Sequence, residues 1–119
     1  MKKVIALGLI MLSSAAFAAT ETIEWTAPEF YMDGMALDPG IEILSYTLYY
    51  GTESGKYSQQ ISISPDSREY TISGLTGKWY FAMTATTIEL EESDYSNEVT
   101  RRFTKGKPRA FTIRFKQRK

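Results

Sequence analysis

The chain has 119 residues, of which 43% are hydrophobic, with 14 basic and 14 acidic side chains and no histidine or cysteine. This length is enough for one domain with a modest core. The missing histidine and cysteine exclude disulfides, thiol nucleophiles and the commonest general base and metal ligand, so stability has to come from packing and strand pairing.

The first eighteen residues (1–18) have the pattern of a bacterial-type secretory signal peptide. A positively charged start leads into the apolar run Val4–Leu12, and Ala16–Ala18 fits a cleavage site. The apolar run is far shorter than the roughly twenty residues that a membrane-spanning helix needs. We therefore expect cleavage between Ala18 and Ala19, a mature chain without a transmembrane segment, and a secreted or periplasmic location.

Six short segments of alternating polar and apolar residues follow, separated by turn signals. In chain order the expected strands are 22–26, 44–51, 57–64, 69–73, 79–86 and 95–103. Leu44–Gly51 is the strongest, because Tyr46, Leu48 and Tyr50 share one face, and burial of Leu48 alone would stabilise a core by about 1.5–3 kcal/mol. Strands at this spacing, without a helical period, indicate an all-β antiparallel sandwich. A barrel is the less favoured alternative, since short strands in this number close poorly around a filled interior.

Six short motifs occur in a fixed order along these segments and the loops between them. They are Ile-Glu-Trp-Thr-Ala-Pro at 23–28, Asp-Gly-Met-Ala-Leu at 33–37, Tyr-Thr-Leu-Tyr-Tyr-Gly at 46–51, Tyr-Thr-Ile-Ser-Gly-Leu at 70–75, Trp79–Ala85, and the run Glu92–Val99. They resemble strand B, the B–C loop, strands C, E and F, and the approach to strand G of a fibronectin type III domain. The likeness spans Thr22–Phe103. It implies an immunoglobulin-like antiparallel β-sandwich over residues 19–104.

Two departures from that family pattern bear on the fold. Only Ala19–Glu21 precede the first expected strand, so strand A is expected to be missing or vestigial, which would leave a sheet edge open. The family usually has a Tyr early in strand F whose hydroxyl ties a corner to the backbone. Here Trp79 is expected at that position, because this alignment directs the larger apolar set inward. The alternative alignment uses Tyr80.

No combination of residues supports catalysis or a cofactor. The chain lacks a Gly-rich phosphate loop and a Gly-x-Ser-x-Gly motif as well as histidine and cysteine. Its carboxylates stand at loop-like positions without paired spacing, as solvated surface acids do. Glu89, Glu91, Glu92 and Asp94 could offer oxygen atoms to Ca²⁺, but this run lacks the Gly-bearing loop pattern of calcium sites. We therefore expect no enzyme and no metal or cofactor site.

Two aromatic sets are the candidate binding residues in the body of the chain. Phe30, Tyr31 and Met32 lie in the long connection before the strongest strand, where a sandwich presents recognition loops; the alternative is that they fold back and cap the core. Tyr49 and Tyr80 are expected to point outward from neighbouring strands. They could stack on a sugar or a protein partner, or they could form a stabilising cross-strand pair.

Charge divides the chain into an acidic body and a basic tail. Residues 19–100 hold all 14 acidic side chains against three basic ones, whereas 101–119 hold nine basic and no acidic side chains. The tail (105–119) begins with a linker-like Lys-Gly-Lys-Pro. Its apolar residues then alternate with polar ones, so 110–116 could form a further strand. The candidate contact residues of the tail are Lys105, Lys107, Arg109, Phe111, Ile113, Arg114, Phe115, Lys116, Arg118 and Lys119.

Three roles are open for the tail at this point. It could pair with an open sheet edge, within one chain or between chains; it could bind anionic lipid, lipopolysaccharide or nucleic acid; or it could be a solvated end. The sequence as a whole predicts an exported non-enzymatic module that recognises a surface protein or a polysaccharide, as in adhesion. The alternatives are a structural subunit that assembles through the tail by strand addition, and tail-mediated binding to an anionic envelope or to nucleic acid.

Overall fold

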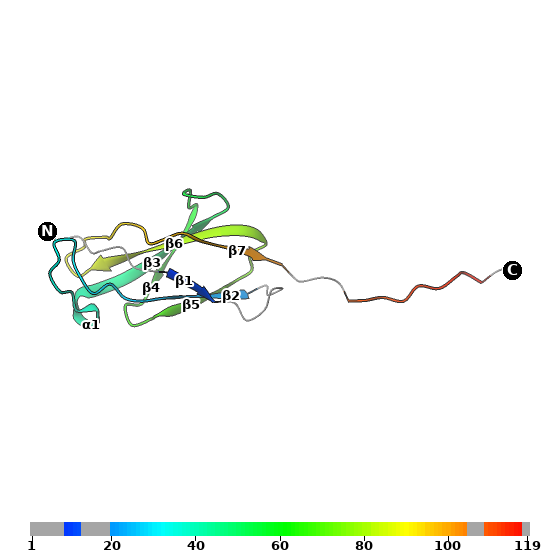
Figure 1. Cartoon of the computed structure of the whole chain (residues 1–119), viewed down its shortest axis with the longest axis horizontal. Helices are drawn as coiled ribbons and strands as arrows, with labels where there is room; N and C mark the ends of the chain where they lie inside the picture. Colours follow the sequence, from blue (N-terminus) through cyan, green and yellow to red (C-terminus); the bar gives the residue numbers. More distant parts are fainter. Residues whose placement is uncertain (1–8, 13–19, 105–108, 118–119) are drawn as a thin grey trace.

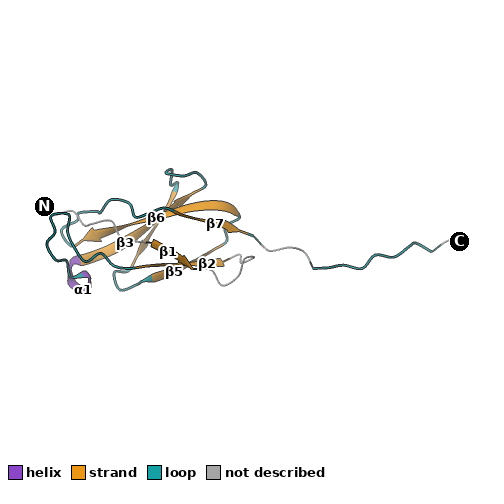
Figure 2. Ribbon diagram, viewed as in Figure 1, coloured by secondary structure: helices purple, strands orange, loops and turns teal. Residues whose placement is uncertain are grey.

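The computed structural model describes residues 9–12, 20–104 and 109–117 (Figures 1 and 2). Its strands form two antiparallel sheets, with the orders β1-β2-β5 and β4-β3-β6-β7. The elements are β1 (Leu9–Leu12), β2 (Thr20–Trp25), α1 (Pro39–Glu42), β3 (Ile43–Gly51), β4 (Gln59–Ile63), β5 (Glu69–Ser73), β6 (Gly77–Thr87) and β7 (Val99–Phe103). The all-β antiparallel sandwich expected from the sequence is confirmed. Within the described ranges, no helix has the length and apolar character needed to cross a membrane.

The larger sheet is organised around β3 and β6, which pair along nearly the whole of β3. The register places Leu48 opposite Met83 and Tyr50 opposite Phe81, so apolar residues of the two strands share the inner face. β3 ends at Gly51, where the Cβ of any other residue would collide with the backbone carbonyl of Lys56. Leu44–Gly51, which has the strongest strand pattern in the sequence, thus lies at the centre of this sheet.

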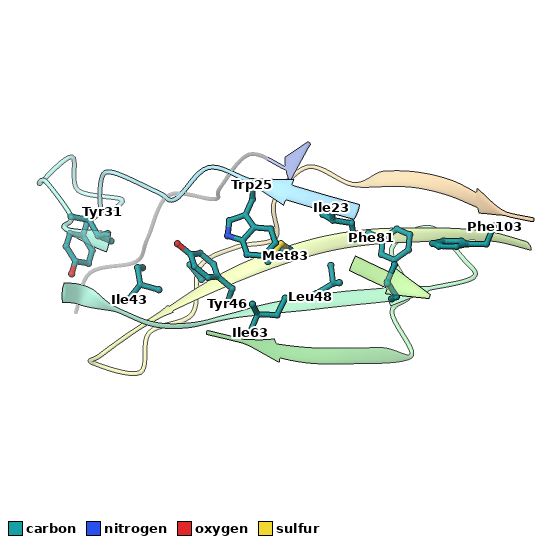
Figure 3. Close-up of a cluster of buried hydrophobic side chains, with 13 residues drawn as sticks. Ile23, Trp25, Tyr31, Ile43, Tyr46, Leu48, Ile63, Phe81, Met83 and Phe103 are labelled. Atoms are coloured by element: carbon teal, nitrogen blue, oxygen red, sulfur yellow. The ribbon is translucent and has the colours of Figure 1, made fainter. Parts of the chain in front are cut away.

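The core lies between the two sheets (Figure 3). Trp25 of β2 meets Tyr46 of β3 across the sandwich, with 5.5 Å between the ring centroids. Tyr46 and Leu48 are fully buried, and Tyr50 stacks on Phe81 with 5.8 Å between the ring centroids. These contacts confirm the predicted inward face of β3.

β6 begins at the corner that fibronectin type III domains usually close with a Tyr. Here the indole N–H of Trp79 donates to the backbone carbonyl of Thr76 at 2.8 Å. The Trp79 ring lies 5.6 Å from the ring of Tyr50 and packs against the core. The expectation that Trp79 rather than Tyr80 takes this position is confirmed, because the indole supplies both the hydrogen bond and the buried area that the corner needs.

The connection between β6 and β7 covers part of β6 through serine side chains. Ser93 donates its N–H to the Ala85 carbonyl at 2.8 Å, and its Oγ accepts from the Ala85 N–H at 2.9 Å. Ser96 makes the same two bonds, at the same distances, with Met83. Because serine hydroxyls replace the carbonyls of a regular ladder here, the strand expected at 95–103 begins only with β7.

β1 occupies the edge of the smaller sheet where strand A was expected to be missing or vestigial. Leu9–Leu12 lies antiparallel to β2 at the edge of the smaller sheet, with Leu9 opposite Trp25 and Leu12 opposite Thr22. The whole chain therefore fills the place that was expected to be empty, and it does so with residues of the predicted signal peptide. The physical reason is that a short apolar run suits a strand as well as a signal sequence. Cleavage after Ala18, which would reopen the edge, stays a prediction.

Candidate functional site

Three segments meet at the end of the sandwich that carries α1 (Figure 1). They are the β2–β3 connection, α1 with the first residues of β3, and the turn that follows β6. The N–H of Ile88 in that turn donates to the carbonyl of Glu42 in α1 at 2.9 Å, and Ile43 lies opposite Thr87. These backbone contacts hold the turn and α1 side by side.

This end displays a group of exposed large apolar side chains, which we call the loop-end patch. Its members are between 47% and 75% exposed. Among residues 20–104, all of which the structure describes, Tyr95 is the one other large hydrophobic residue that is similarly exposed. The exposed apolar surface of the body is therefore concentrated at one end. The loop-end patch consists of Phe30, Met32, Met35, Ile41, Leu44, Ile88 and Leu90.

A tight hairpin in the β2–β3 connection separates the predicted candidates Phe30, Tyr31 and Met32. The Tyr31 N–H donates to the Met35 carbonyl at 2.8 Å, and Gly34 takes the positive φ of 87° that closes the turn. Tyr31 is buried in the core, and this burial raises the pKa of its hydroxyl. The interpretation as a core cap is therefore correct for Tyr31 alone. Phe30 and Met32, on either side of it in the sequence, are exposed.

The single turn α1 is held by capping bonds that keep Ile41 at the surface. The Asp38 carboxylate accepts from the Gly40 N–H at 3.0 Å, while the Glu42 carboxylate accepts from the Asp38 N–H at 2.8 Å. These bonds resemble those of a capping box, with the glutamate one residue later than in the usual motif, and Pro39 suits the first helical position. Ile41, which is 70% exposed, is thus displayed on a fixed backbone.

The turn after β6 holds Leu90 in the left-handed conformation, with a φ of 65°, and no other described residue except glycine has a positive φ. This conformation costs an L-residue roughly 1–2 kcal/mol. Leu90 donates its N–H to the Thr87 carbonyl at 2.9 Å, and Glu91 donates its own to Thr87 Oγ1 at 3.3 Å. A leucine that is 75% exposed adds little to the core. An exposed leucine held in this conformation is therefore a candidate binding residue.

Carboxylates accompany the loop-end patch and cations do not. Residues 29–44 and 87–91 contain no Lys or Arg. A surface that combines apolar side chains with negative charge favours a partner that offers apolar groups and positive charge. Among the residues that the structure describes, no group of carboxylates is placed to hold a metal ion. The acidic residues of these segments are Glu29, Asp33, Asp38, Glu42, Glu89 and Glu91.

A second site lies on the outer face of the larger sheet, where three tyrosines form what we call the tyrosine cluster. The Tyr95 ring meets the Tyr49 ring edge-on at 5.1 Å and the Tyr57 ring at 5.3 Å. The rings of Tyr49 and Tyr57 are 6.4 Å apart. Edge-to-face aromatic pairs are worth about 0.5–1.5 kcal/mol beyond their burial, so the cluster stabilises this face.

Two glutamates hold the hydroxyls of the tyrosine cluster. Tyr49 and Thr84 each donate to Glu92 Oε2 at 2.6 Å, and Tyr57 donates to Glu98 Oε2 at 2.5 Å. Burial, together with the hydrogen bond and charge of Glu92, raises the pKa of Tyr49 to about 12. Burial and the bond to Glu98 likewise raise the pKa of Tyr57. Glu92, one of the carboxylates considered for Ca²⁺, thus serves as a hydrogen-bond acceptor for side chains of the sheet.

The predicted cross-strand pair of Tyr49 and Tyr80 is wrong. In the observed register Tyr49 faces Ala82 and Tyr80 faces Gly51, so the two tyrosines are only diagonal neighbours. Tyr80 instead lies below the Lys78 ammonium group, which is 5.3 Å from its ring centroid. The prediction failed because alternation fixes the face of a strand but not its register.

The tyrosine cluster borders a surface hollow of about 280 Å³, lined by Tyr49, Thr84, Glu92, Ser93, Asp94 and Tyr95. A sugar-binding platform needs an open ring face with free hydrogen-bonding groups beside it. Here the rings pack against each other, and the hydroxyls of Tyr49 and Tyr57 are already bonded to carboxylates. The cluster is therefore better suited to holding the sheet than to stacking on a ligand.

In the tail, residues 109–117 extend away from both sheets and belong to no helix or strand (Figure 1). All of them are exposed, and Phe111, Ile113 and Phe115 are 83%, 83% and 99% exposed. The strand considered at 110–116 thus has no partner within the described residues, and its pairing stays a prediction. Four of the predicted contact residues, Lys105, Lys107, Arg118 and Lys119, lie outside the described residues.

No protein-family model and no curated protein matches the chain. The sixth fibronectin type III domain from human fibronectin type III domain containing protein 3 is similar with a TM-score of 0.61 and 17% identity, over 92% of each chain. A second fibronectin type III domain structure of that human protein gives a TM-score of 0.60 and 20% identity, over 87% of this chain and 89% of the other. The β-1,2-glucanase from Parabacteroides distasonis gives 0.57 and 23% identity over 87% of this chain, which spans only 14% of the glucanase. At these identities the likeness concerns the fold, and the chain has the fold of a fibronectin type III domain.

Proposed function

We propose that the chain is an exported, non-enzymatic binding module that recognises a protein surface through the loop-end patch. The fold is one used by binding and structural modules, and fold alone does not identify a partner. The observation that carries the proposal is the concentration of exposed apolar side chains at one end, including a strained and exposed Leu90. Soluble proteins rarely keep such a patch without a partner to cover it.

The chemistry of the patch favours a protein over a polysaccharide. Aliphatic and thioether side chains such as Ile41, Leu90 and Met35 fill apolar pockets, whereas sugars are bound through open aromatic faces and hydrogen bonds. Phe30 is the one aromatic member of the patch. The acidic residues beside the patch make a partner surface with apolar groups and Lys or Arg the best complement.

A non-enzymatic role is supported by the chemistry of the side chains. The chain has no histidine or cysteine to act as base or nucleophile near neutral pH. Glu92 and Glu98 accept hydrogen bonds from tyrosine, threonine or serine side chains, and Asp38 and Glu42 accept from backbone N–H groups. They act as structural acceptors in these contacts.

Binding to cells of the producing bacterium tests the proposal. The protein is labelled through an engineered cysteine at Ser62→Cys, which is unambiguous because the chain has no other cysteine. Ile41→Asp and Leu90→Asp should each weaken binding about tenfold or more, as expected when a charge replaces an apolar anchor. Ser58→Asp, which adds the same charge in an exposed loop at the opposite end, should leave binding unchanged.

Treatment of the cells separates the two classes of partner. Digestion of surface proteins with a protease should abolish binding if the partner is a protein. Binding that survives protease would identify a polysaccharide or lipid and contradict the proposal. Equal binding by the parent protein, Ile41→Asp and Leu90→Asp would exclude the loop-end patch as the binding surface.

A further inference from the structure

β1 covers the outer edge of β2, and all of β1 lies within the predicted signal peptide. Cleavage after Ala18 would remove β1 and leave β2 paired with β5 alone. The edge that opens lies beside Ile23 and Trp25, which are buried in the core. An open edge presents unpaired backbone N–H and C=O groups, and natural sheets normally cover such an edge.

We propose that the tail of a second copy takes the place of β1, so that mature chains join by strand addition. The inference rests on the export proposed above, because only the cleaved chain has the open edge. Phe111, Ile113 and Phe115 occur at every second position and are exposed in the single chain. A solvated tail has no need of that alternation, whereas a strand with one buried face requires it.

The register of β1 shows where the apolar residues of the tail would lie. Leu9 and Met11 stand opposite Trp25 and Ile23, whose own side chains are buried in the core. An antiparallel tail strand with Ile113 opposite Trp25 places Phe115 opposite Ile23. Phe111 then falls opposite Ala27, which also packs against the core. All three apolar residues of the tail would therefore stand opposite residues of the core.

The same register gives the outward face of the tail strand favourable partners. With Ile113 opposite Trp25, the guanidinium of Arg114 stands opposite the carboxylate of Glu24. Opposite charges on facing positions of an antiparallel pair stabilise it modestly. A shift by two residues would instead place Phe115 opposite Glu21, whose side chain is only 2% exposed and lies 3.9 Å from the Arg101 guanidinium. The first register is therefore the one we adopt.

The direction in which the tail leaves the domain indicates that the added strand comes from a second copy and not from the same molecule. β1 and β7 run toward the same end of the domain, the end from which the tail leaves (Figure 1). In its own molecule, the tail leaves the domain after Phe103, but a strand in the place of β1 would have to begin beside Ala27, nearer the other end of the sandwich. The tail would therefore have to run back along the domain before it could pair. Because Arg101 lies beside Glu21, this return covers about eight strand residues, or roughly 26 Å.

The chain available for that return is too short. The seven residues from Thr104 to Ala110, fully extended at about 3.3–3.6 Å per residue, reach about 23–25 Å, which does not exceed that distance. Nothing is left for the two reversals of direction that an antiparallel strand in the same molecule would need. A tail that turned straight back could only lie parallel to β2. An antiparallel strand in the place of β1 therefore comes from another copy.

Long-range charge favours the same association. Residues 19–100 carry 14 acidic and three basic side chains, a net charge of −11, whereas the tail is basic throughout. Attraction between the tail of one copy and the body of the next should raise the association rate, and salt should weaken it. The contact joins two different surfaces, so it produces open chains of copies unless two copies exchange tails reciprocally.

The test begins with the whole chain expressed in a bacterial host. Mass spectrometry of the exported product should show a protein that begins at Ala19, and sedimentation velocity should show oligomers. The triple variant Phe111→Ser, Ile113→Ser, Phe115→Ser should sediment as a folded monomer. Thr112→Ser, which changes only the opposite face of the tail strand, should still form oligomers.

Cysteine cross-linking tests the register. Two exported single variants, Glu24→Cys and Arg114→Cys, are mixed and oxidised; the parent chain contains no cysteine, so any disulfide joins the chosen positions. A disulfide-linked heterodimer should form in several-fold higher yield than with Glu24→Cys and Thr112→Cys, whose side chains are two positions out of register. Directly opposite Cβ atoms lie close enough for a disulfide, whereas diagonal ones do not.

Several results would overturn the inference. They are an exported product that keeps residues 1–18, a mature chain that is monomeric, equal cross-linking by the two cysteine pairs, and a disulfide that forms only within one molecule when Glu24→Cys and Arg114→Cys are combined in a single chain. Leu90→Asp separates this inference from the proposed function. It should weaken partner binding about tenfold or more and leave self-association unchanged. Loss of oligomers in Leu90→Asp would therefore assign the tail contact to the loop-end patch instead of the β2 edge.

Discussion

The strained turn after β6 gives the sharpest prediction about stability. Leu90 has a φ of 65°, and its side chain is 75% exposed. Replacement by Gly relieves about 1–2 kcal/mol of left-handed strain and loses about 0.5–1 kcal/mol through the flexibility of Gly in the unfolded chain. Replacement by Ala removes the same side chain and keeps the strain. Leu90→Gly should therefore be more stable than Leu90→Ala by about 0.5–1 kcal/mol.

Ile88 provides the matched control two residues away. It is an exposed apolar member of the same turn, and its φ is not positive. Here the order should reverse, with Ile88→Ala more stable than Ile88→Gly by about 0.5–1 kcal/mol. Thermal unfolding of all four variants measures this, since 1 kcal/mol corresponds to a shift in Tm of about 4–8 °C for a domain of this size. A Leu90→Ala variant more stable than Leu90→Gly would refute the assignment of strain to Leu90.

Three further predictions follow from the core and the tyrosine cluster. Leu48→Ala should lower the free energy of unfolding by about 2–5 kcal/mol in a urea titration, because Leu48 is fully buried; a loss below 1 kcal/mol would place it outside the core. Because the pKa of Tyr49 rises from 10.0 in the unfolded chain to about 12 in the folded protein, its contribution to stability is complete below pH 10 and is lost as the pH rises through about 12. Tyr49→Phe should flatten that alkaline decline, and an unchanged decline would count against the bond to Glu92. Hydrogen bonds from Ser54, Tyr57 and Gly55 outweigh the opposing effect of burial and hold the pKa of Glu98 below 4.5, so its contribution is present above pH 4.5 and is lost at more acidic pH. Glu98→Gln should remove that part of the acid dependence of unfolding, which denaturant titrations at several pH values measure.

The fold was largely predictable because the pattern of the strands is local. The alternation in Leu44–Gly51 identified the central strand and its inward face. The position of Trp79 was predictable because the alignment that places it at the corner directs the larger set of apolar side chains into the core. The register between strands was not predictable, which is why Tyr49 and Tyr80 were proposed as a cross-strand pair although they are diagonal neighbours. The hydrogen bonds from Ser93 and Ser96 to the backbone of β6 were not predictable either, since isolated serines usually indicate loops.

The candidate site was only partly predictable, because the fold assembles it from distant segments. Phe30 and Met32 were identified from their loop, but nothing local separates them from Tyr31, which is buried. Ile41 and Leu90 stand in short turns without a pattern, and their place in the loop-end patch depends on the bond between Ile88 and α1. The strain at Leu90 has no signature in the sequence at all, since it is a property of the backbone.

β1 shows a different limit of sequence reasoning. The apolar run Val4–Leu12 carries the pattern of a signal peptide, and the same residues pair with β2 in the whole chain. Both descriptions follow from one physical property, a short apolar segment. Which of them applies to the protein at its destination depends on cleavage after Ala18.

Site-specific photocrosslinking on cells of the organism that produces the protein shows whether the loop-end patch contacts the partner. A photoreactive amino acid is placed at Ile88, in the loop-end patch, or at Tyr80, on the outer face of the larger sheet. A discrete protein adduct is expected from position 88, and it should disappear when Ile41→Asp is added. No adduct is expected from position 80. Bound protein that gives an adduct from position 80 but none from position 88 would contradict the proposed binding through the loop-end patch.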